Sequence, residues 1–140
     1  MTTLLKPKDL ARLHAAAFRE SRPWGTEEFE ALLASKHCFC VGDSHGFAIG
    51  RLIAQESELL TIAVDPVSQG KGHGRLLLQH YHDEAQARGA NTLFLEVAKD
   101  NTKALNLYKT MSYEVISVRA GYYKRTTGTP VDALIMQLKL

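Results

Sequence analysis

The sequence carries little net charge and has no long apolar run. Lys and Arg number 17 against 15 for Asp and Glu, so the formal net charge is only +2. Nucleic-acid binding would need basic residues clustered on one face, and so small a charge does not support it. No stretch approaches the roughly 20 apolar residues of a membrane span, and residues 1–7 are too short and too interrupted for a signal peptide. We therefore expect a cytoplasmic protein that binds neither nucleic acid nor membranes.

Cysteine is also scarce, and its spacing argues against a disulfide. Cys38 and Cys40 are two positions apart, and in a strand their Cβ atoms would lie on one side, roughly 6.5–7 Å apart. We expect buried, free thiols in a reducing compartment. His80 and His82 lie two positions apart on an expected helix and face different ways. The other histidines show no metal-ligand spacing either, so we expect no metal.

The composition that remains is typical of one globular domain. The 140 residues are 45% apolar and 23% charged, which is ordinary for a folded protein. A chain of this length can bury a self-sufficient core. It shows no internal repeat, low-complexity tract or linker. We therefore expect a single domain over residues 1–140.

The stretch 59–76 combines a strand, a glycine-rich loop and the start of a helix. A β-rich apolar run over residues 59–64 ends at Asp65-Pro66, a pair that stops strands. Glycine then occupies positions 70, 72 and 74, and a helical pattern follows. The first N–H groups of a helix have no internal partner and bind anions, and glycine lets a ligand approach the backbone closely. These features predict a phosphate site; a helix that simply begins after a loose glycine turn would show the same pattern.

The spacing of the glycines in this loop shows which of the known phosphate-binding motifs it fits. A Walker A loop has Lys and then Ser or Thr after its last glycine, whereas Arg75 follows Gly74 here. A dinucleotide fingerprint would need its third glycine at the position of Arg75. The pattern that fits is Gln69-x-x-Gly72-x-Gly74, which resembles the acyl-coenzyme A signature of the GNAT N-acetyltransferase superfamily.

Hydrophobic periodicity and turn signals predict the other elements. We expect Pro7 in the first turn of a helix and Thr26 as the N-cap of the next helix. The strand–helix–strand unit over residues 59–97 predicts parallel neighbours with a right-handed crossover. The expected fold class is α/β (α+β), with a mixed, largely antiparallel central sheet and helices on both faces. The expected helices cover residues 8–18, 26–35, 75–88 and 101–111, and the expected strands cover 2–5, 37–41, 46–55, 59–64, 91–97, 113–118 and 133–138.

Glu96 is unusual because it lies inside an apolar strand. A buried carboxylate costs several kcal/mol unless it is paired or hydrated. One interpretation is a strand-end residue that points into solvent. The other follows from its place near the carboxyl end of a strand beside the glycine loop, where ligands bind in open α/β sheets. Partial burial there would raise its pKa and make it a usable base.

Two aromatic residues have both a packing and a functional interpretation. Tyr108 lies seven residues after Asn101, two helical turns away, so the two side chains share a helix face. Such a tyrosine can be part of an amphipathic core, or its phenol can protonate a leaving thiolate. Trp24, the single tryptophan, can be a packing anchor or a wall of a substrate cleft.

Further motifs extend the resemblance to the GNAT superfamily over residues 23–136. The segment Leu95-Glu96-Val97, followed by Asn101-x-x-Ala104-x-x-Leu107-Tyr108 and Tyr113, resembles the second half of the acetyltransferase signature. Other segments are similar to the bacterial branch that acetylates the alanine of ribosomal proteins. These segments are Pro23-Trp24-x4-Phe29, residues 62–66, and Tyr122-Tyr123 followed by residues 132–136.

The resemblance implies an acetyl-CoA-dependent N-acetyltransferase. It implies Glu96 as the general base, Tyr108 as the general acid, and backbone N–H groups near Val64 as donors to the oxyanion. Residues implied to bind acetyl-CoA are Ile62, Ala63, Val64, Gln69, Gly70, Lys71, Gly72, His73, Gly74, Arg75 and Asn101. Residues implied to bind the acceptor are Trp24, Tyr122 and Tyr123, the two tyrosines in a loop-like segment before residues 124–130.

The implied acceptor is the N-terminal α-amine of a small-subunit ribosomal protein, with alanine as the N-terminal residue. Two alternatives stay open: the same chemistry on a small-molecule amine or another protein N-terminus, and a non-catalytic coenzyme A-binding module. The module would need neither Glu96 nor Tyr108. Two positions depart from the family pattern. Ser112 replaces a helix-terminating glycine, and Gly121 stands where relatives often have asparagine.

Overall fold

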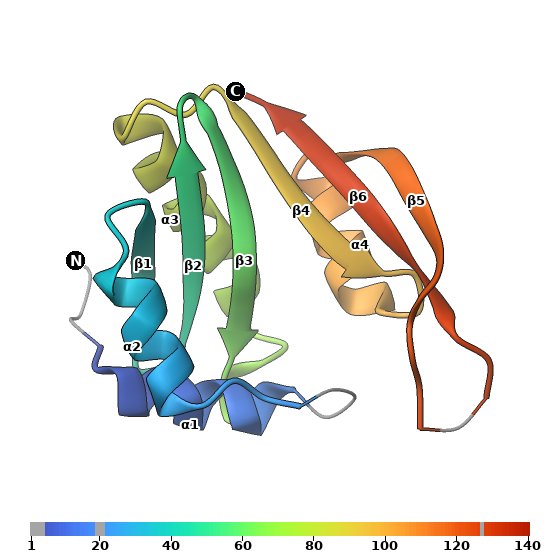
Figure 1. Ribbon diagram of the computed structural model, residues 1–140, viewed down its shortest axis with the longest axis horizontal. Helices are drawn as coiled ribbons and strands as arrows, with labels where there is room; N and C mark the ends of the chain where they lie inside the picture. The colour runs from blue at the N-terminus through green and yellow to red at the C-terminus, as the bar shows by residue number, and fades with distance from the viewer. Residues whose placement is uncertain (1–4, 19–21, 127) are drawn as a thin grey trace.

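The computed structural model describes residues 5–18, 22–126 and 128–140. Figure 1 shows its helices and strands, labelled in chain order. Their bounds are α1 Pro7–Ala17, α2 Thr26–Ala34, β1 Cys38–Asp43, β2 Gly46–Ile53, β3 Glu56–Val64, the short 3-10 helix η1 Pro66–Ser68, α3 His73–Ala87, β4 Thr92–Ala98, α4 Thr102–Thr110, β5 Glu114–Tyr123 and β6 Val131–Lys139.

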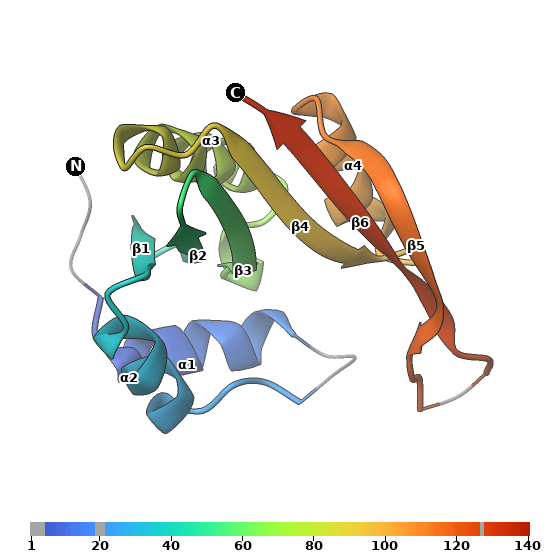
Figure 2. The same ribbon diagram turned by 45° about the horizontal axis from the view of Figure 1, so that its top comes forward.

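The strands form one six-stranded sheet in the order β1-β2-β3-β4-β6-β5. Neighbouring strands are antiparallel except for β3 and β4, which are parallel and are joined through α3. Helices α1 and α2 cover one face of the sheet, and α3 and α4 cover the other (Figure 2). The structure therefore confirms the expected mixed, largely antiparallel sheet and its parallel pair.

The sheet opens between β3 and β4. These strands pair only where residues 56–58 face residues 92–94, although β3 continues to Val64 and β4 to Ala98. Beyond the paired positions the two strands diverge, and Figure 1 shows the V-shaped separation between their ends. The edges that face each other across this opening therefore have no ladder partner among the described residues.

Hydrophobic clusters hold each helical layer to the sheet. On the α3/α4 face, Leu78 and Leu93 are 0% exposed in a cluster that also contains Leu95 and Val97. Burial of one such side chain contributes about 1.5–3 kcal/mol. Because side chains alternate along a strand, Glu96 points to the opposite face, the one covered by α1 and α2.

Local sequence determines where the helices begin. Pro7 occupies the first turn of α1, as expected. The expected N-cap at Thr26 is wrong by one residue, because α2 is capped at Gly25. The Glu28 carboxylate accepts a hydrogen bond from the Gly25 N–H at 3.0 Å and caps the helix from its first turn. The Asn101 side chain caps α4, since its Oδ1 accepts from the backbone N–H of Ala104.

Ser112 takes the role of a glycine at the end of α4. Its φ is 75°, in the left-handed region. The Tyr113 N–H donates to the Tyr108 carbonyl at 3.0 Å and the Ser112 N–H donates to Lys109 at 3.1 Å, which is the Schellman pattern. Gly89 ends α3 in the same way with a φ of 102°. A Cβ in this conformation costs about 1 kcal/mol.

Two expectations about strands are wrong. Tyr122 and Tyr123 do not lie in a loop, because β5 continues through them and Tyr123 still pairs with Val131 of β6. Strand β3 begins at Glu56 rather than at Leu59, since its pairing with β2 extends to that residue. The expected strand over residues 2–5 lies outside the described residues except for Leu5, which is not in a strand.

The cysteines are free thiols, Cys38 and Cys40, both half-buried rather than fully buried. They lie in β1, which has a neighbouring strand on one side only, so the sheet covers them incompletely. Among the helices in the described ranges, none is long and apolar enough to cross a membrane.

Candidate active site

The glycine loop presents open backbone at the start of α3. Gly70 and Gly72 have left-handed φ values of 76° and 83°, and Gly72 is the N-cap of the 15-residue helix. A Cβ placed at either position would meet no atom within 4 Å, so the space beside them is open. The unpaired N–H groups of the first helical turn follow directly, which is the arrangement that binds phosphate.

The opening in the sheet is lined by backbone polar groups. The Asp65 N–H donates to the His45 carbonyl at 2.7 Å, and hydrogen-bonded positions alternate along an antiparallel ladder. The backbone groups of Ile62 and Val64 therefore point away from β2 and into the opening. The Val64 carbonyl accepts a hydrogen bond from the Gln69 side chain at 3.0 Å. An extended polar chain could pair with the groups that remain.

The opposite edge repeats this pattern. The Lys99 N–H donates to the Asp132 carbonyl at 2.9 Å, so alternation turns the backbone groups of Glu96 and Ala98 toward the opening rather than toward β6. The Ala98 carbonyl already accepts from the Asn101 N–H at 2.9 Å, so the backbone groups of Glu96 and the Ala98 N–H are those left for a ligand on this wall. Such groups need a partner when water is excluded, and a bound amide-containing chain would supply it.

Glu96 is held by two side chains from β5. Its side chain is 25% exposed. The Tyr123 hydroxyl donates to Glu96 Oε2 at 3.1 Å, and Arg119 Nη1 lies 3.6 Å from Oε1. The pKa of Tyr123 lies well above its ordinary value, mainly because the phenol is buried and secondly because the Glu96 carboxylate is close. The hydroxyl therefore keeps its proton and remains a donor. The carboxylate is thus oriented at the edge of the opening and partly accessible.

Tyr108 lies on the other side of the sheet. It is 5% exposed, packs within the α3/α4 cluster, and makes an edge contact with Tyr113 at 5.8 Å between ring centroids. Burial raises the pKa of Tyr108 far above its ordinary value, so the phenol keeps its proton. The packing interpretation of Tyr108 is therefore correct, and a proton-donating role is compatible with it. Glu96 and Tyr108 thus lie on opposite faces of the sheet.

Trp24 packs against the helices of the α1/α2 layer. Its backbone N–H donates to His14 Nδ1 at 3.0 Å. Its ring lies 5.0 Å from the His14 ring and 5.8 Å from the Phe29 ring. These contacts support the packing interpretation. Tyr122, by contrast, is 52% exposed, with the Arg119 guanidinium 5.1 Å from its ring centroid.

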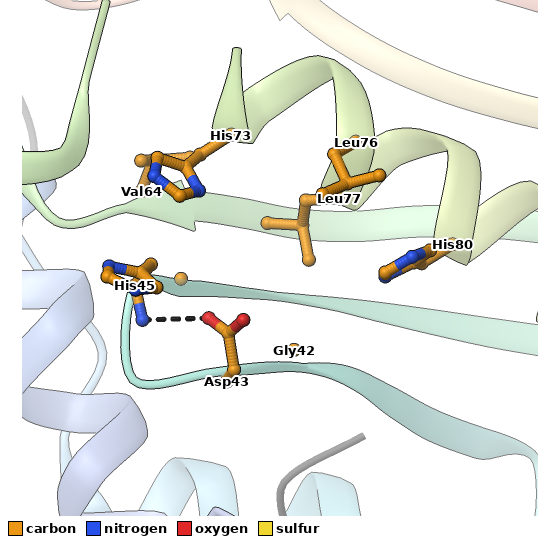
Figure 3. Close-up of a pocket in the computed structure, with 9 residues that line it drawn as sticks. Gly42, Asp43, His45, Val64, His73, Leu76, Leu77 and His80 are labelled. Atoms are coloured by element: carbon orange, nitrogen blue, oxygen red, sulfur yellow. Dashed lines mark hydrogen bonds between the residues drawn. The ribbon is translucent and has the colours of Figure 1, made fainter. Parts of the chain in front are cut away.

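A small hollow of about 40 Å³ lies between the β1–β2 turn and α3, next to the glycine loop. Figure 3 shows His45 and His73 at one end of it and His80 at the other. The His45 and His73 rings stack with centroids 4.6 Å apart, and His45 Nδ1 lies 2.9 Å from the Ser68 hydroxyl. The hollow is lined by neither Glu96 nor Tyr108.

Sequence reasoning missed the side chains that organise the site. The contacts of three side chains were not predicted, because their partners lie on elements far away along the chain. These are Arg119 with Glu96, Arg125 with Asp100 and His45 with His73. Their positions became apparent only from the pairing of β5 with β6 and from the turn between β1 and β2.

Comparison with known proteins gives one family. Residues 8–113 match the Acetyltransferase (GNAT) family. The chain is similar to a protein of Escherichia coli K12 named [Ribosomal protein bS18]-alanine N-acetyltransferase, with 35% identity over 97% of this chain and 95% of that protein. It is also 36% identical to N-alpha-acetyltransferase RimI of Mycobacterium tuberculosis, over 91% of this chain and 82% of that protein.

Solved structures agree with the sequence comparison. The crystal structure of the Escherichia coli ribosomal-protein-S18-alanine N-acetyltransferase matches with a TM-score of 0.85 and 32% identity, over 95% of this chain and 86% of that chain. A nourseothricin acetyltransferase matches with a TM-score of 0.64 and 26% identity, over 74% of this chain and 66% of that chain.

Proposed function

Because this chain belongs to the GNAT acetyltransferase family, we propose that it transfers the acetyl group of acetyl-CoA to the N-terminal α-amine of ribosomal protein bS18, at alanine. The relatives of similar length carry that activity in their names. The observation that carries the proposal is the opening between β3 and β4, which has polar backbone on both walls and Glu96 at its edge.

The residues present fit acetyl-CoA. The glycine loop and the first turn of α3 offer N–H groups to the pyrophosphate, and the free edge of β3 offers backbone partners to the amide-bearing arm. Asn101, at the N-terminus of α4, lies on the other side of the opening. We assign acetyl-CoA binding to Ile62, Ala63, Val64, Gln69, Gly70, Lys71, Gly72, His73, Gly74, Arg75 and Asn101.

Acetyl-CoA supplies a thioester whose carbonyl carbon an amine can attack. Glu96 removes a proton from the acceptor ammonium, and backbone N–H groups near Val64 stabilise the oxyanion. A C–N bond then forms and the C–S bond breaks. Tyr108 donates its proton to the sulfur that leaves, and the second proton released by the acceptor nitrogen restores the phenol. Glu96 and Tyr108 lie on opposite faces of the sheet. This placement suits a base for the amine and an acid for the thiolate, since the amine and the thiolate lie on opposite sides of the reacting carbon.

The acceptor amine is chosen partly by its own pKa. An α-amino group has a pKa of roughly 7.7–8.0 against about 10.4 for lysine, so at pH 7 its free-amine fraction is more than about a hundredfold larger. A single carboxylate base is therefore better matched to a chain terminus. We assign acceptor contacts to Trp24, Tyr122 and Tyr123, within a single catalytic domain of residues 1–140.

The proposal is tested by competing acceptors. A peptide with the bS18 N-terminus should react with a kcat/KM at least about a hundredfold above that of a polyamine, because at pH 7 the terminus has a much larger free-amine fraction than an amine with a pKa near that of lysine. Comparable rates on the polyamine would replace the proposal with a small-molecule function. Coenzyme A binding without release of free thiol on any amine would show a non-catalytic module.

A further inference from the structure

One ion pair ties the β5–β6 hairpin to the start of α4. Arg125 Nη2 lies 2.7 Å from Asp100 Oδ1, and Arg125 Nε lies 3.0 Å from Oδ2, so the guanidinium binds both carboxylate oxygens. The Arg125 side chain is 13% exposed, against 45–72% for the arginines of the other described ion pairs. Bidentate pairing fixes orientation as well as distance.

The same guanidinium contacts the side chain that holds Glu96. Arg125 lies over the Tyr123 ring, 5.6 Å from its centroid. The Tyr123 hydroxyl in turn donates to Glu96 Oε2 at 3.1 Å. A continuous set of contacts therefore runs from Asp100 through Arg125 and Tyr123 to Glu96.

Backbone pairing just before Tyr123 is irregular, although Tyr123 itself pairs with Val131. The pairing of β5 with β6 is interrupted between Arg119 and Tyr123, and Gly121 has a left-handed φ of 60° there. Tyr123 is the last residue of its strand. A side-chain tether at this point therefore supplies the orientation that an interrupted ladder leaves loose.

We propose that Arg125, held by Asp100, is a positioning residue that fixes Tyr123 and, through it, the Glu96 carboxylate. The effect on turnover rests on the proposed function, in which Glu96 accepts the proton of the acceptor amine. A general base must lie within hydrogen-bond reach of that proton, and a small misplacement of a catalytic group costs up to about a hundredfold in rate.

The test compares Arg125→Gln, Arg125→Lys, Asp100→Asn and the double Asp100→Asn, Arg125→Gln variant. Arg88→Gln is a matched control, because Arg88 pairs with Glu84 at 2.7 Å and lies 4.7 Å from the Phe39 ring centroid, away from the site. Steady-state kinetics with the bS18 peptide, calorimetry with coenzyme A, and hydrogen exchange over residues 119–126 are measured for each protein.

We expect Arg125→Gln to lower kcat/KM by about 10–100-fold, with coenzyme A affinity changed less than about twofold. Arg125→Lys should recover part of the loss, because it keeps the charge but not the planar fork. The double variant should be no worse than Arg125→Gln, since Asp100 acts through Arg125. Additive losses, an equal loss in Arg88→Gln, or a kcat/KM within about twofold of wild type would overturn the proposal.

Hydrogen exchange separates this proposal from the proposed function. Exchange over residues 119–126 should quicken by about tenfold in Arg125→Gln and stay unchanged in Arg88→Gln. If the wild-type protein leaves the bS18 peptide unmodified, the proposed function fails. Hydrogen exchange alone then tests whether Arg125 orients Tyr123. Unchanged exchange in Arg125→Gln would then overturn the positioning role.

Discussion

Acidification should destabilise this protein through His14. The side chain is 1% exposed, and its Nδ1 accepts a hydrogen bond from the Trp24 backbone N–H at 3.0 Å. Its ring stacks on Phe18 with centroids 3.9 Å apart. Burial, partly opposed by Glu28, lowers its pKa from 6.5 to about 4. A protonated ring would lose the acceptor that ties Trp24 to α1 and would place a charge in an apolar layer.

The pKa values give the sign and size of the effect. The unfolded chain takes up the proton near pH 6.5 and the folded protein near pH 4, so the stability contributed by neutral His14 is complete above pH 6.5 and is lost as the pH falls toward 4. Linkage between these values gives a loss of about 2 kcal/mol at pH 5 and about 3 kcal/mol at pH 4. Burial also lowers the pKa of His82, so its protonation adds to the loss of stability as the pH falls.

Urea unfolding from pH 8 to pH 4 measures this dependence. His14→Gln cannot titrate but keeps an acceptor for the Trp24 N–H, so its free energy of unfolding should fall less steeply between pH 6.5 and pH 4. The difference in slope should approach about 1.4 kcal/mol per pH unit, the value for one proton. Normalising both proteins at pH 8 removes the cost of the substitution itself. Parallel curves for the two proteins would refute the reasoning.

Further substitutions test other parts of the account. Gly72→Ala should weaken acetyl-CoA binding about tenfold or more by calorimetry, since a Cβ obstructs the approach of a ligand to the backbone; an equal loss in Gly89→Ala, which has a similar backbone and open space, would contradict this. Tyr108→Phe should keep its packing while kcat falls by about 10²–10⁴-fold, and near wild-type kcat would leave packing alone. Glu96→Gln should lower kcat/KM and move its pH optimum upward, which an unaltered pH–rate profile would exclude. Ser112→Gly should raise the free energy of unfolding by about 1 kcal/mol in denaturant unfolding, because Ser112 has a φ of 75°. An unchanged free energy of unfolding would show that this conformation carries no strain.

The fold was largely predictable because its signals are local. The glycine loop, Asn101 as a cap and the apolar period of each strand determine their elements without distant help. Two of the errors have different causes. The first is local, because the Glu28 carboxylate caps α2 at Gly25 rather than at Thr26. The second is long-range, because pairing with β6 draws Tyr122 and Tyr123 into β5, although Gly121 is typical of a turn.

The site was predictable only in part for the same reason. Glu96 stood out because a carboxylate interrupts an apolar strand, and Tyr108 because of its helical spacing from Asn101. No pattern in the sequence indicates that Arg119 meets Glu96 or that Arg125 meets Asp100, 25 residues earlier. Such contacts depend on tertiary structure, which spacing along one strand or helix does not encode.

The most direct test uses full-length ribosomal protein bS18 from cells of the source organism that lack this gene. Incubation with the purified protein and acetyl-CoA should add one acetyl group, which tandem mass spectrometry should locate on the N-terminal alanine, with every internal lysine unmodified. Glu96→Gln and Tyr108→Phe should slow this modification without moving it. Acetyl groups on lysine side chains, or bS18 left unmodified while a small amine is consumed, would contradict the account.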